Sequence, residues 1–210
     1  MKVIVFGAAG ATGALLVRRS LERGHTITAF VRNPSAPTLE GVRAVHGDAR
    51  DAAAVSAAII DHDAVLLALG SRSLGTSDLL EVSSRNVIAA MERYGVRRLI
   101  ALSAAGALHD AGVRQGPVGR AMLRVLMSTL LRNVRRDQAA QERQIEASGL
   151  DYTIVRPPFL TNGPASGRYR VDLDGLPAKA GPISRADVAA FMVDHLEDAS
   201  FIRKGPHLAT

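Results

Sequence analysis

The chain has 210 residues, of which 47% are hydrophobic and 22% are charged, the balance of a soluble folded domain rather than of a disordered or fibrous chain. It has no cysteine, which excludes a disulfide framework, a thiolate metal site and a cysteine nucleophile. Lys and Arg number 26 against 20 Asp and Glu, and this net charge of +6 favours an anionic partner. No stretch approaches the roughly 20 apolar residues that span a bilayer, so we expect a cytoplasmic protein without membrane insertion.

Short β-branched runs alternate with longer helical patterns. Strands are expected at Lys2 to Phe6, Thr26 to Val31, Val42 to Val45, Ala64 to Leu69, Arg97 to Leu102 and Tyr152 to Val155. Helices are expected at Ala11 to Arg23, Ala52 to Ile60, Ser77 to Tyr94, Asp137 to Ser148 and Arg185 to Glu197. This alternation predicts an α/β fold, a Rossmann-type doubly wound parallel sheet with helices on both faces, in one domain over residues 1–210. A loop or small hairpin is expected from Gly163 to Pro182.

A glycine-rich turn follows the first expected strand and opens the first helix. Its members that we expect to bind a dinucleotide are Gly7, Ala9, Gly10, Ala11, Thr12 and Gly13. The first glycine permits the tight turn, the second lets the backbone approach a pyrophosphate, and the third allows close packing of helix on strand. A turn that binds no ligand is the alternative.

Arg32 follows the second strand, at the place where an acidic residue would bind the ribose of NAD. A guanidinium there suits a 2′-phosphate, because it carries a permanent charge and paired donors. The sequence therefore favours NADPH, and a solvated surface arginine is the alternative.

Two further loops follow strands at the same edge of the expected sheet, where open α/β sheets bind ligands. Asp48 and Ala49 follow the third strand, and we expect them beside the adenine end of the cofactor. Leu69, Gly70 and Arg72 follow the fourth strand and would lie along the dinucleotide. Surface roles for Asp48 and Arg72 are equally open.

With these motifs, Ser103, the stretch Ser148-Gly-Leu and the stretch Arg156-Pro-Pro, the chain resembles atypical short-chain dehydrogenases/reductases over nearly its full length. It is most similar to the NADPH-dependent flavin reductase / biliverdin-IXβ reductase group, and more loosely to NmrA-like regulators. The resemblance implies a catalytic Ser103 bordering the nicotinamide, although a serine ending a strand also serves as a turn residue.

The resemblance also implies that Pro158 and Phe159 border the cofactor, and that about 103–136 and 157–185 contribute the substrate pocket. Phe159 stands where the biliverdin-IXβ reductase pattern has a histidine. This difference weakens a specific prediction of biliverdin, but it leaves an apolar platform on which a flavin ring could lie.

No Tyr-x-x-x-Lys pair is present at the place where typical short-chain dehydrogenases carry one. Reduction of a simple ketone benefits from a positioned acid, whereas a flavin spreads incoming electrons over its ring. We therefore expect an NADPH-dependent oxidoreductase that transfers hydride to a planar acceptor, a flavin first and a tetrapyrrole or quinone next. The alternatives are a non-catalytic NADP(H)-binding redox sensor and, third, a sugar epimerase or ketone reductase.

The remaining patterns assign no further ligand. The six histidines show no metal-ligand spacing, so we assign no metal. The segment Gly119 to Arg136 reads as a basic amphipathic helix, which could lie on an anionic membrane or nucleic acid, but more often covers a core, a dimer partner or a site mouth. It lacks interleaved aromatic residues, so no nucleic-acid partner is expected. A monomer and a homodimer are both compatible with the sequence.

Overall fold

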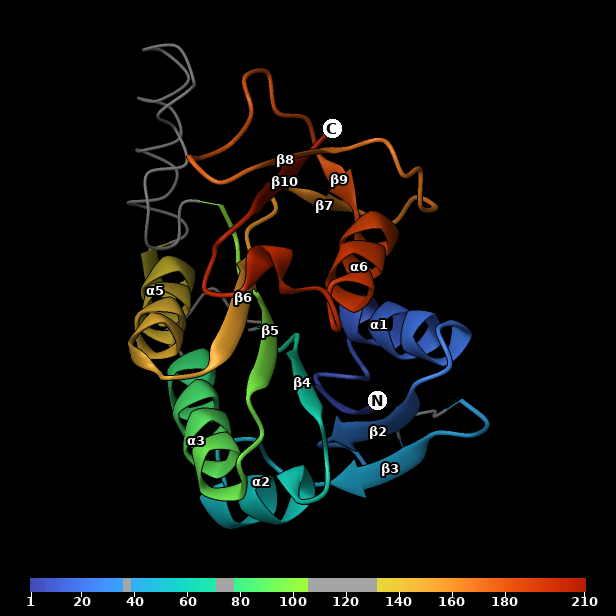
Figure 1. Cartoon of the computed structure of the whole chain (residues 1–210), viewed down its shortest axis with the longest axis vertical. Helices are drawn as coiled ribbons and strands as arrows, with labels where there is room; N and C mark the ends of the chain where they lie inside the picture. The colour runs from blue at the N-terminus through green and yellow to red at the C-terminus, as the bar shows by residue number, and fades with distance from the viewer. Residues whose placement is uncertain (36–38, 71–77, 106–131) are drawn as a thin grey trace.

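Figure 1 shows a computed structural model of the chain, which describes residues 1–35, 39–70, 78–105 and 132–210. The predicted site residue Arg72 and residues 119–131 of the basic segment lie outside these ranges. The described residues contain a six-stranded parallel sheet in the order β3-β2-β1-β4-β5-β6. Its strands are β1 (Lys2–Phe6), β2 (Thr26–Val31), β3 (Arg43–His46), β4 (Ala64–Leu67), β5 (Arg98–Leu102) and β6 (Asp151–Val155). The predicted doubly wound sheet is confirmed.

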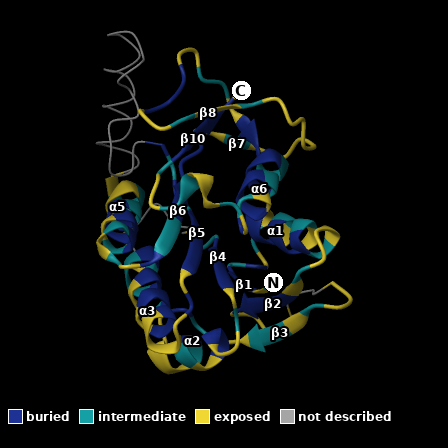
Figure 2. Ribbon diagram, viewed as in Figure 1, coloured by how far each residue is buried: buried dark blue, intermediate teal, exposed yellow. Residues whose placement is uncertain are grey.

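Helices cover both faces of this sheet. One face carries α1 (Ala11–Glu22) and α6 (Arg185–Asp194), and the other carries α2 (Ala52–Ile59), α3 (Leu79–Tyr94) and α5 (Arg132–Ala147). Alternate residues of β1 enter different cores: Val3 and Val5 pack with α1 and α6, whereas Ile4 and Phe6 pack on the opposite face. Figure 2 shows the central strands of the sheet buried between helices whose outer surfaces are exposed. A sheet covered on both sides explains why most residues of these central strands are apolar on both faces.

The strand order reverses next to β1. This strand pairs in parallel with β2 on one side and with β4 on the other, and the chain reaches α1 directly after it. In open α/β sheets, such a switch point leaves a crevice at the carboxyl ends of the strands, where ligands bind. The residues that follow β1 to β6 are therefore the candidates for ligand binding.

The C-terminal part of the chain forms small sheets above this edge. The strand β7 (Leu160–Thr161) pairs in parallel with β9 (Ile183–Ser184), and β8 (Arg170–Asp172) pairs antiparallel with β10 (His207–Ala209). The short helix η1 (Ala199–Phe201) lies between α6 and β10. Of the loop and the small hairpin expected for residues 163–182, the structure shows the loop, with β8 as its one strand. No hairpin forms there, because the partner of β8 comes from beyond α6. Pairing across so many residues leaves no turn signal in the local sequence.

Arg98 anchors α6 at the opposite, amino edge of the sheet. Its Nη2 donates to the carbonyl oxygen of His195 at 2.6 Å, and its Nε donates to that of Leu196 at 3.2 Å. Burial lowers the pKa of Arg98 to about 10, so the side chain stays charged at neutral pH. Cations stabilise the carboxyl end of a helix, and we assign this buried arginine to the fold. Among the described residues, no helix combines the length and apolarity needed to cross a membrane.

Candidate cofactor and substrate site

The glycine turn after β1 is built so closely that side chains cannot enter it. Gly7 has φ +82°, and a Cβ atom on it would lie 2.5 Å from the carbonyl oxygen of Ala68. A Cβ atom on Gly13 would overlap the carbonyl oxygen of Gly7, which also accepts a hydrogen bond from the N–H of Gly10 at 2.9 Å. The first and third glycines are therefore required by the packing of the turn itself.

The amino end of α1 is open toward ligands. Gly10 is its N-cap residue, no side chain of the described residues caps this end, and its first turn carries no acidic residue. Ala9 and Ala11 are exposed beside it, whereas Thr12 and Gly13 are buried against the sheet. The first N–H groups of a helix lack intrahelical partners, and they carry partial positive charge. This end can hold the two phosphates of a dinucleotide.

Arg32 and Asp48 follow the neighbouring strands β2 and β3 at the same edge. Arg32 is exposed directly after Val31, where its side chain is free to reach a phosphate. Asp48 is half-buried, and its Oδ1 accepts the N–H of Arg50 at 2.9 Å, so this carboxylate also shapes its own loop. Ala49 is buried beneath this loop.

Asn86 is a supporting residue that the sequence reasoning missed. From α3, its Nδ2 donates to the carbonyl oxygens of Ala49 at 3.1 Å and Arg50 at 2.9 Å. The amide therefore fixes the loop in which Asp48 lies. Its position in the middle of a helical pattern gives no hint of this contact in the sequence.

Leu69 and Gly70 follow β4 and complete the edge next to the glycine turn. Leu69 is half-buried against the core, and Gly70 is exposed. The N–H of Ala68 donates to the carbonyl oxygen of Phe6 at 3.0 Å, so the loop starts hydrogen-bonded to β1.

Ser103 follows β5 and is 6% exposed. Its N–H donates to the carbonyl oxygen of Val155 at 2.9 Å, and the N–H of Ala105 donates to that of Pro157 at 2.8 Å. These bonds hold the end of β5 alongside the segment that follows β6. The Ser103 hydroxyl finds no hydrogen-bond partner among the described residues.

The segment after β6 presents Pro158 and Phe159 near this serine. Pro158 is half-buried, whereas the Phe159 side chain is 65% exposed, the largest exposed fraction among the large apolar side chains described. The carbonyl oxygen of Phe159 accepts the N–H of Ile183 at 3.0 Å, so its backbone is held while its ring faces solvent. An exposed aromatic face at a site edge is suited to stack on a planar ligand.

An aspartate on α6 holds the loop above this segment. Asp187 is buried, and its carboxylate accepts the N–H groups of Ser166 and Gly167 and the hydroxyls of Ser166 and Ser184, at 2.8 to 3.0 Å. Burial alone would raise the pKa of Asp187, but these hydrogen bonds lower it below its ordinary value. The residues from Ser166 onward are thereby tied to the first turn of α6.

The described residues between β5 and β6 include no tyrosine or lysine, the residue types of the proton donor in typical short-chain dehydrogenases. The helix α5, which leads into β6, contains neither residue type. Tyr94 ends α3 and Tyr152 lies at the start of β6, both at the amino edge of the sheet, while Tyr169 packs edge-on against Phe191. Burial raises the pKa values of Tyr152 and Tyr169.

A parallel sheet whose first strand ends in this glycine turn defines a dinucleotide-binding Rossmann domain. The chain belongs to the NAD(P)H-binding family, whose model matches residues 7–199. It is an NAD(P)H-dependent reductase of the atypical short-chain dehydrogenase/reductase type.

Three relatives illustrate the range of this group. The uncharacterized sugar epimerase YhfK of Bacillus subtilis is 30% identical over 94% of this chain and 89% of its own length. The solved structure of an anaerobilin reductase, ChuY from Escherichia coli O157:H7, is 27% identical with a TM-score of 0.78, covering 100% of this chain and 97% of its own. A protein from Bacillus halodurans described as an NAD-dependent epimerase/dehydratase is 26% identical with a TM-score of 0.81, covering 100% and 94%.

Proposed function

We propose that this protein transfers hydride from NADPH to a planar conjugated acceptor, in the first instance a flavin. The observation that carries the proposal is the composition of α5, which offers no tyrosine and no lysine to the reaction centre. An acceptor that spreads the incoming electrons over its own ring needs such an acid least. Binding and orientation can then supply most of the rate enhancement.

The proposed roles follow the order of the strands. The amino end of α1 and the turn from Gly7 to Gly13 would hold the pyrophosphate, and Arg32 would bind the 2′-phosphate that distinguishes NADPH from NADH. Ser103 would border the nicotinamide, and the exposed ring of Phe159 would support the acceptor. The bound cofactor would supply the hydride, and the protein would align the two rings and exclude water between them.

A linear tetrapyrrole is the second acceptor that the comparisons favour. ChuY, which shares the whole fold, is an anaerobilin reductase, and its class of acceptor is also conjugated. The name of YhfK suggests a sugar instead. Epimerisation of a sugar passes through proton and hydride transfer at a carbinol carbon, and α5 offers neither a tyrosine nor a lysine for that step.

The test is anaerobic steady-state oxidation of NADPH with three acceptors: riboflavin phosphate, biliverdin and a nucleotide sugar. We expect saturable turnover with riboflavin phosphate or biliverdin, and none with the sugar. Phe159→Ala should lower kcat/KM for the planar acceptor by about tenfold, the loss expected for one stacked aromatic contact. Ile60→Ala is the matched control, because Ile60 is also an exposed apolar side chain but lies at the end of α2, at the amino edge of the sheet. Tight NADPH binding without turnover of any acceptor would replace the proposal with a redox sensor.

A further inference from the structure

Gln141 is a buried polar side chain that the fold does not use. It lies on α5 with 1% of its surface exposed, and neither its Oε1 nor its Nε2 finds a hydrogen-bond partner among the described residues. A buried polar group without a partner costs about 1–3 kcal/mol, and native proteins keep few of them. An apolar residue here would stabilise the fold, so the presence of an amide calls for a functional reason.

The neighbours of Gln141 on the helix show which way it faces. Asp137 and Gln144 accept hydrogen bonds from α3, with Asp137 receiving two backbone N–H groups at the start of that helix. Glu142 instead contacts Arg156 at the end of β6. On a helix with 3.6 residues per turn, position 141 lies between these two directions. Gln141 therefore faces the sheet between α3 and β6, which is where β5 runs.

The level of Gln141 along β5 follows from its neighbour Glu142. The carboxylate of Glu142 accepts hydrogen bonds from the guanidinium of Arg156. Arg156 follows Val155, which pairs with Leu102, so Arg156 and Ser103 are the next residues of two paired strands. Alternation places Ser103 on the same face of β5 as Leu99 and Ala101, which belong to the core cluster of Ile145 on α5. These contacts place Gln141 near the level of Ser103.

We propose that Gln141 and Ser103 form one polar site and that Gln141 is a positioning residue for Ser103. The Ser103 hydroxyl is also buried and finds no partner in the described part of the chain, so the pair offers Oγ, Oε1 and Nε2 in one layer. An internal water needs two to four polar partners, and this layer supplies three. Such a water would let the amide fix the direction of the Ser103 O–H bond.

The consequence for the reaction rests on the function proposed above. Negative charge collects on the acceptor as the hydride arrives, and an oriented donor beside the nicotinamide stabilises that charge without reorganising. A freely rotating hydroxyl would do so less well. Gln141 would therefore act on the hydride-transfer step through Ser103, without touching NADPH itself.

The first experiment tests the shared site by protein unfolding, without an activity assay. Gln141→Met, Ser103→Ala and the double variant of the full chain are unfolded in urea. If the two groups share a site, the double variant departs from additivity by about fivefold or more in the unfolding equilibrium constant. Ser20→Ala combined with Gln141→Met is the matched control. Ser20 is another buried serine whose hydroxyl has no partner among residues 1–35, 39–70, 78–105 and 132–210, and it lies on α1, on the other face of the sheet. This pair should be additive within about twofold. Additivity for Gln141 and Ser103 would overturn the proposal.

The second experiment tests the positioning role. Gln141→Met should lower kcat for the planar acceptor by about tenfold while the NADPH Kd stays unchanged, the pattern of an interaction made in the transition state. In Gln141→Glu, a protonated carboxyl keeps one donor and one acceptor, so activity should be retained at low pH and lost as the new group ionises. An unchanged kcat in Gln141→Met would overturn the positioning role. Absence of turnover in the wild type would instead contradict the proposed function, and the unfolding cycle would still decide whether the site exists.

Discussion

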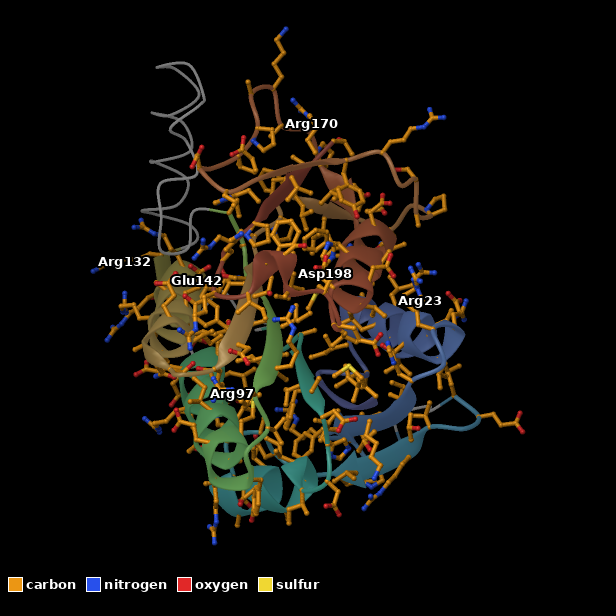
Figure 3. The ribbon with its side chains drawn as sticks, viewed as in Figure 1. Arg23, Arg97, Arg132, Glu142, Arg170 and Asp198 are labelled. Carbon is orange, nitrogen blue, oxygen red and sulfur yellow. The ribbon has the colours of Figure 1, made fainter. Side chains whose placement is uncertain are left out.

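The guanidinium of Arg156 lies against the carboxylate of Glu142, with Nη2 2.8 Å from Oε2 and both side chains buried (Figure 3 labels Glu142 on α5). The same nitrogen contacts Glu146 at 2.9 Å, and Nη1 donates to the carbonyl oxygen of Gly205 at 3.2 Å. One arginine therefore joins the end of β6 to α5 and to the C-terminal segment. Arg156 directly precedes the two prolines, Pro157 and Pro158, that lead to Phe159.

Removing one partner of this pair should destabilise the protein strongly. Glu142→Gln leaves the buried guanidinium with Glu146 as its remaining countercharge, and we expect a loss of about 2–3 kcal/mol in the free energy of unfolding, measured in urea. The double variant Glu142→Leu, Arg156→Met should recover much of that loss, because it buries no charge. Arg23→Ala, which breaks an exposed ion pair with Asp194, should cost less than about 1 kcal/mol. Equal losses in Glu142→Gln and Arg23→Ala would contradict the burial of the first pair.

The second and third glycines of the turn should fail in different ways. Gly13→Ala forces a methyl group onto the carbonyl oxygen of Gly7, so it should lower the free energy of unfolding by about 1–3 kcal/mol or more. At Gly10, a Cβ atom would lie 3.1 Å from that oxygen, which small shifts can relieve. Gly10→Ala should therefore keep most of the stability but weaken NADPH binding by about tenfold or more, because the methyl group holds the pyrophosphate away. Thermal unfolding and fluorescence titration with NADPH separate the two effects.

Arg32 should decide between the two nicotinamide cofactors. Arg32→Ala removes the charge that we propose binds the 2′-phosphate, and we expect NADPH to bind about 10- to 100-fold more weakly while NADH binding changes little. Arg18→Ala, at an exposed arginine on α1, serves as the control for net charge. Dissociation constants of NADPH and NADH, measured for the wild type and for both variants, test this prediction. Equal weakening of NADPH and NADH would remove Arg32 from the 2′-phosphate site.

The carboxylate of Asp187 should make the free energy of unfolding depend on pH in the acid range. Its folded pKa lies below the ordinary value of 3.8, so its contribution is complete above that value and is lost as the pH falls through the folded pKa. Asp187→Asn should cost about 1.5–3 kcal/mol at pH 7, because several hydrogen bonds lose a charged acceptor. The difference between wild type and variant should shrink below about pH 4. Urea unfolding across this range checks it, with the exposed Glu197→Gln as control. A difference that stays constant down to pH 2 would contradict the assignment.

Much of the central sheet could be predicted because its signals are local. The strands β1 and β2 were predicted with their observed bounds, since apolar residues on both faces and flanking glycines mark them. The helix α6 ends at Asp194, three residues before the predicted Glu197. Helix ends depend on contacts from other parts of the chain, which the local sequence does not show.

The parts that escaped prediction depend on distant pairs. Asp137 receives N–H groups of α3 from 56 and 57 residues away, and Asp187 holds a loop some 20 residues upstream. The spacing Ser184-x-x-Asp187 carries the signal of a helix cap, but nothing in it indicates Ser166 or Gly167. Asn86 and Gln141 look like ordinary helix residues in the sequence. Only the packing shows that Asn86 holds the loop of Asp48 and that Gln141 is buried with no partner among the residues that the structure describes.

The most direct test of the account is anaerobic single-turnover mixing of the NADPH-loaded protein with riboflavin phosphate, using NADPH with deuterium at the transferred position of the nicotinamide ring. We predict that the flavin is bleached at the rate at which NADPH is oxidised, and that deuterium slows both. This result would establish direct hydride transfer to a planar acceptor. NADPH that binds but stays reduced in the presence of riboflavin phosphate and of biliverdin would contradict the account and indicate a sensor of the cofactor.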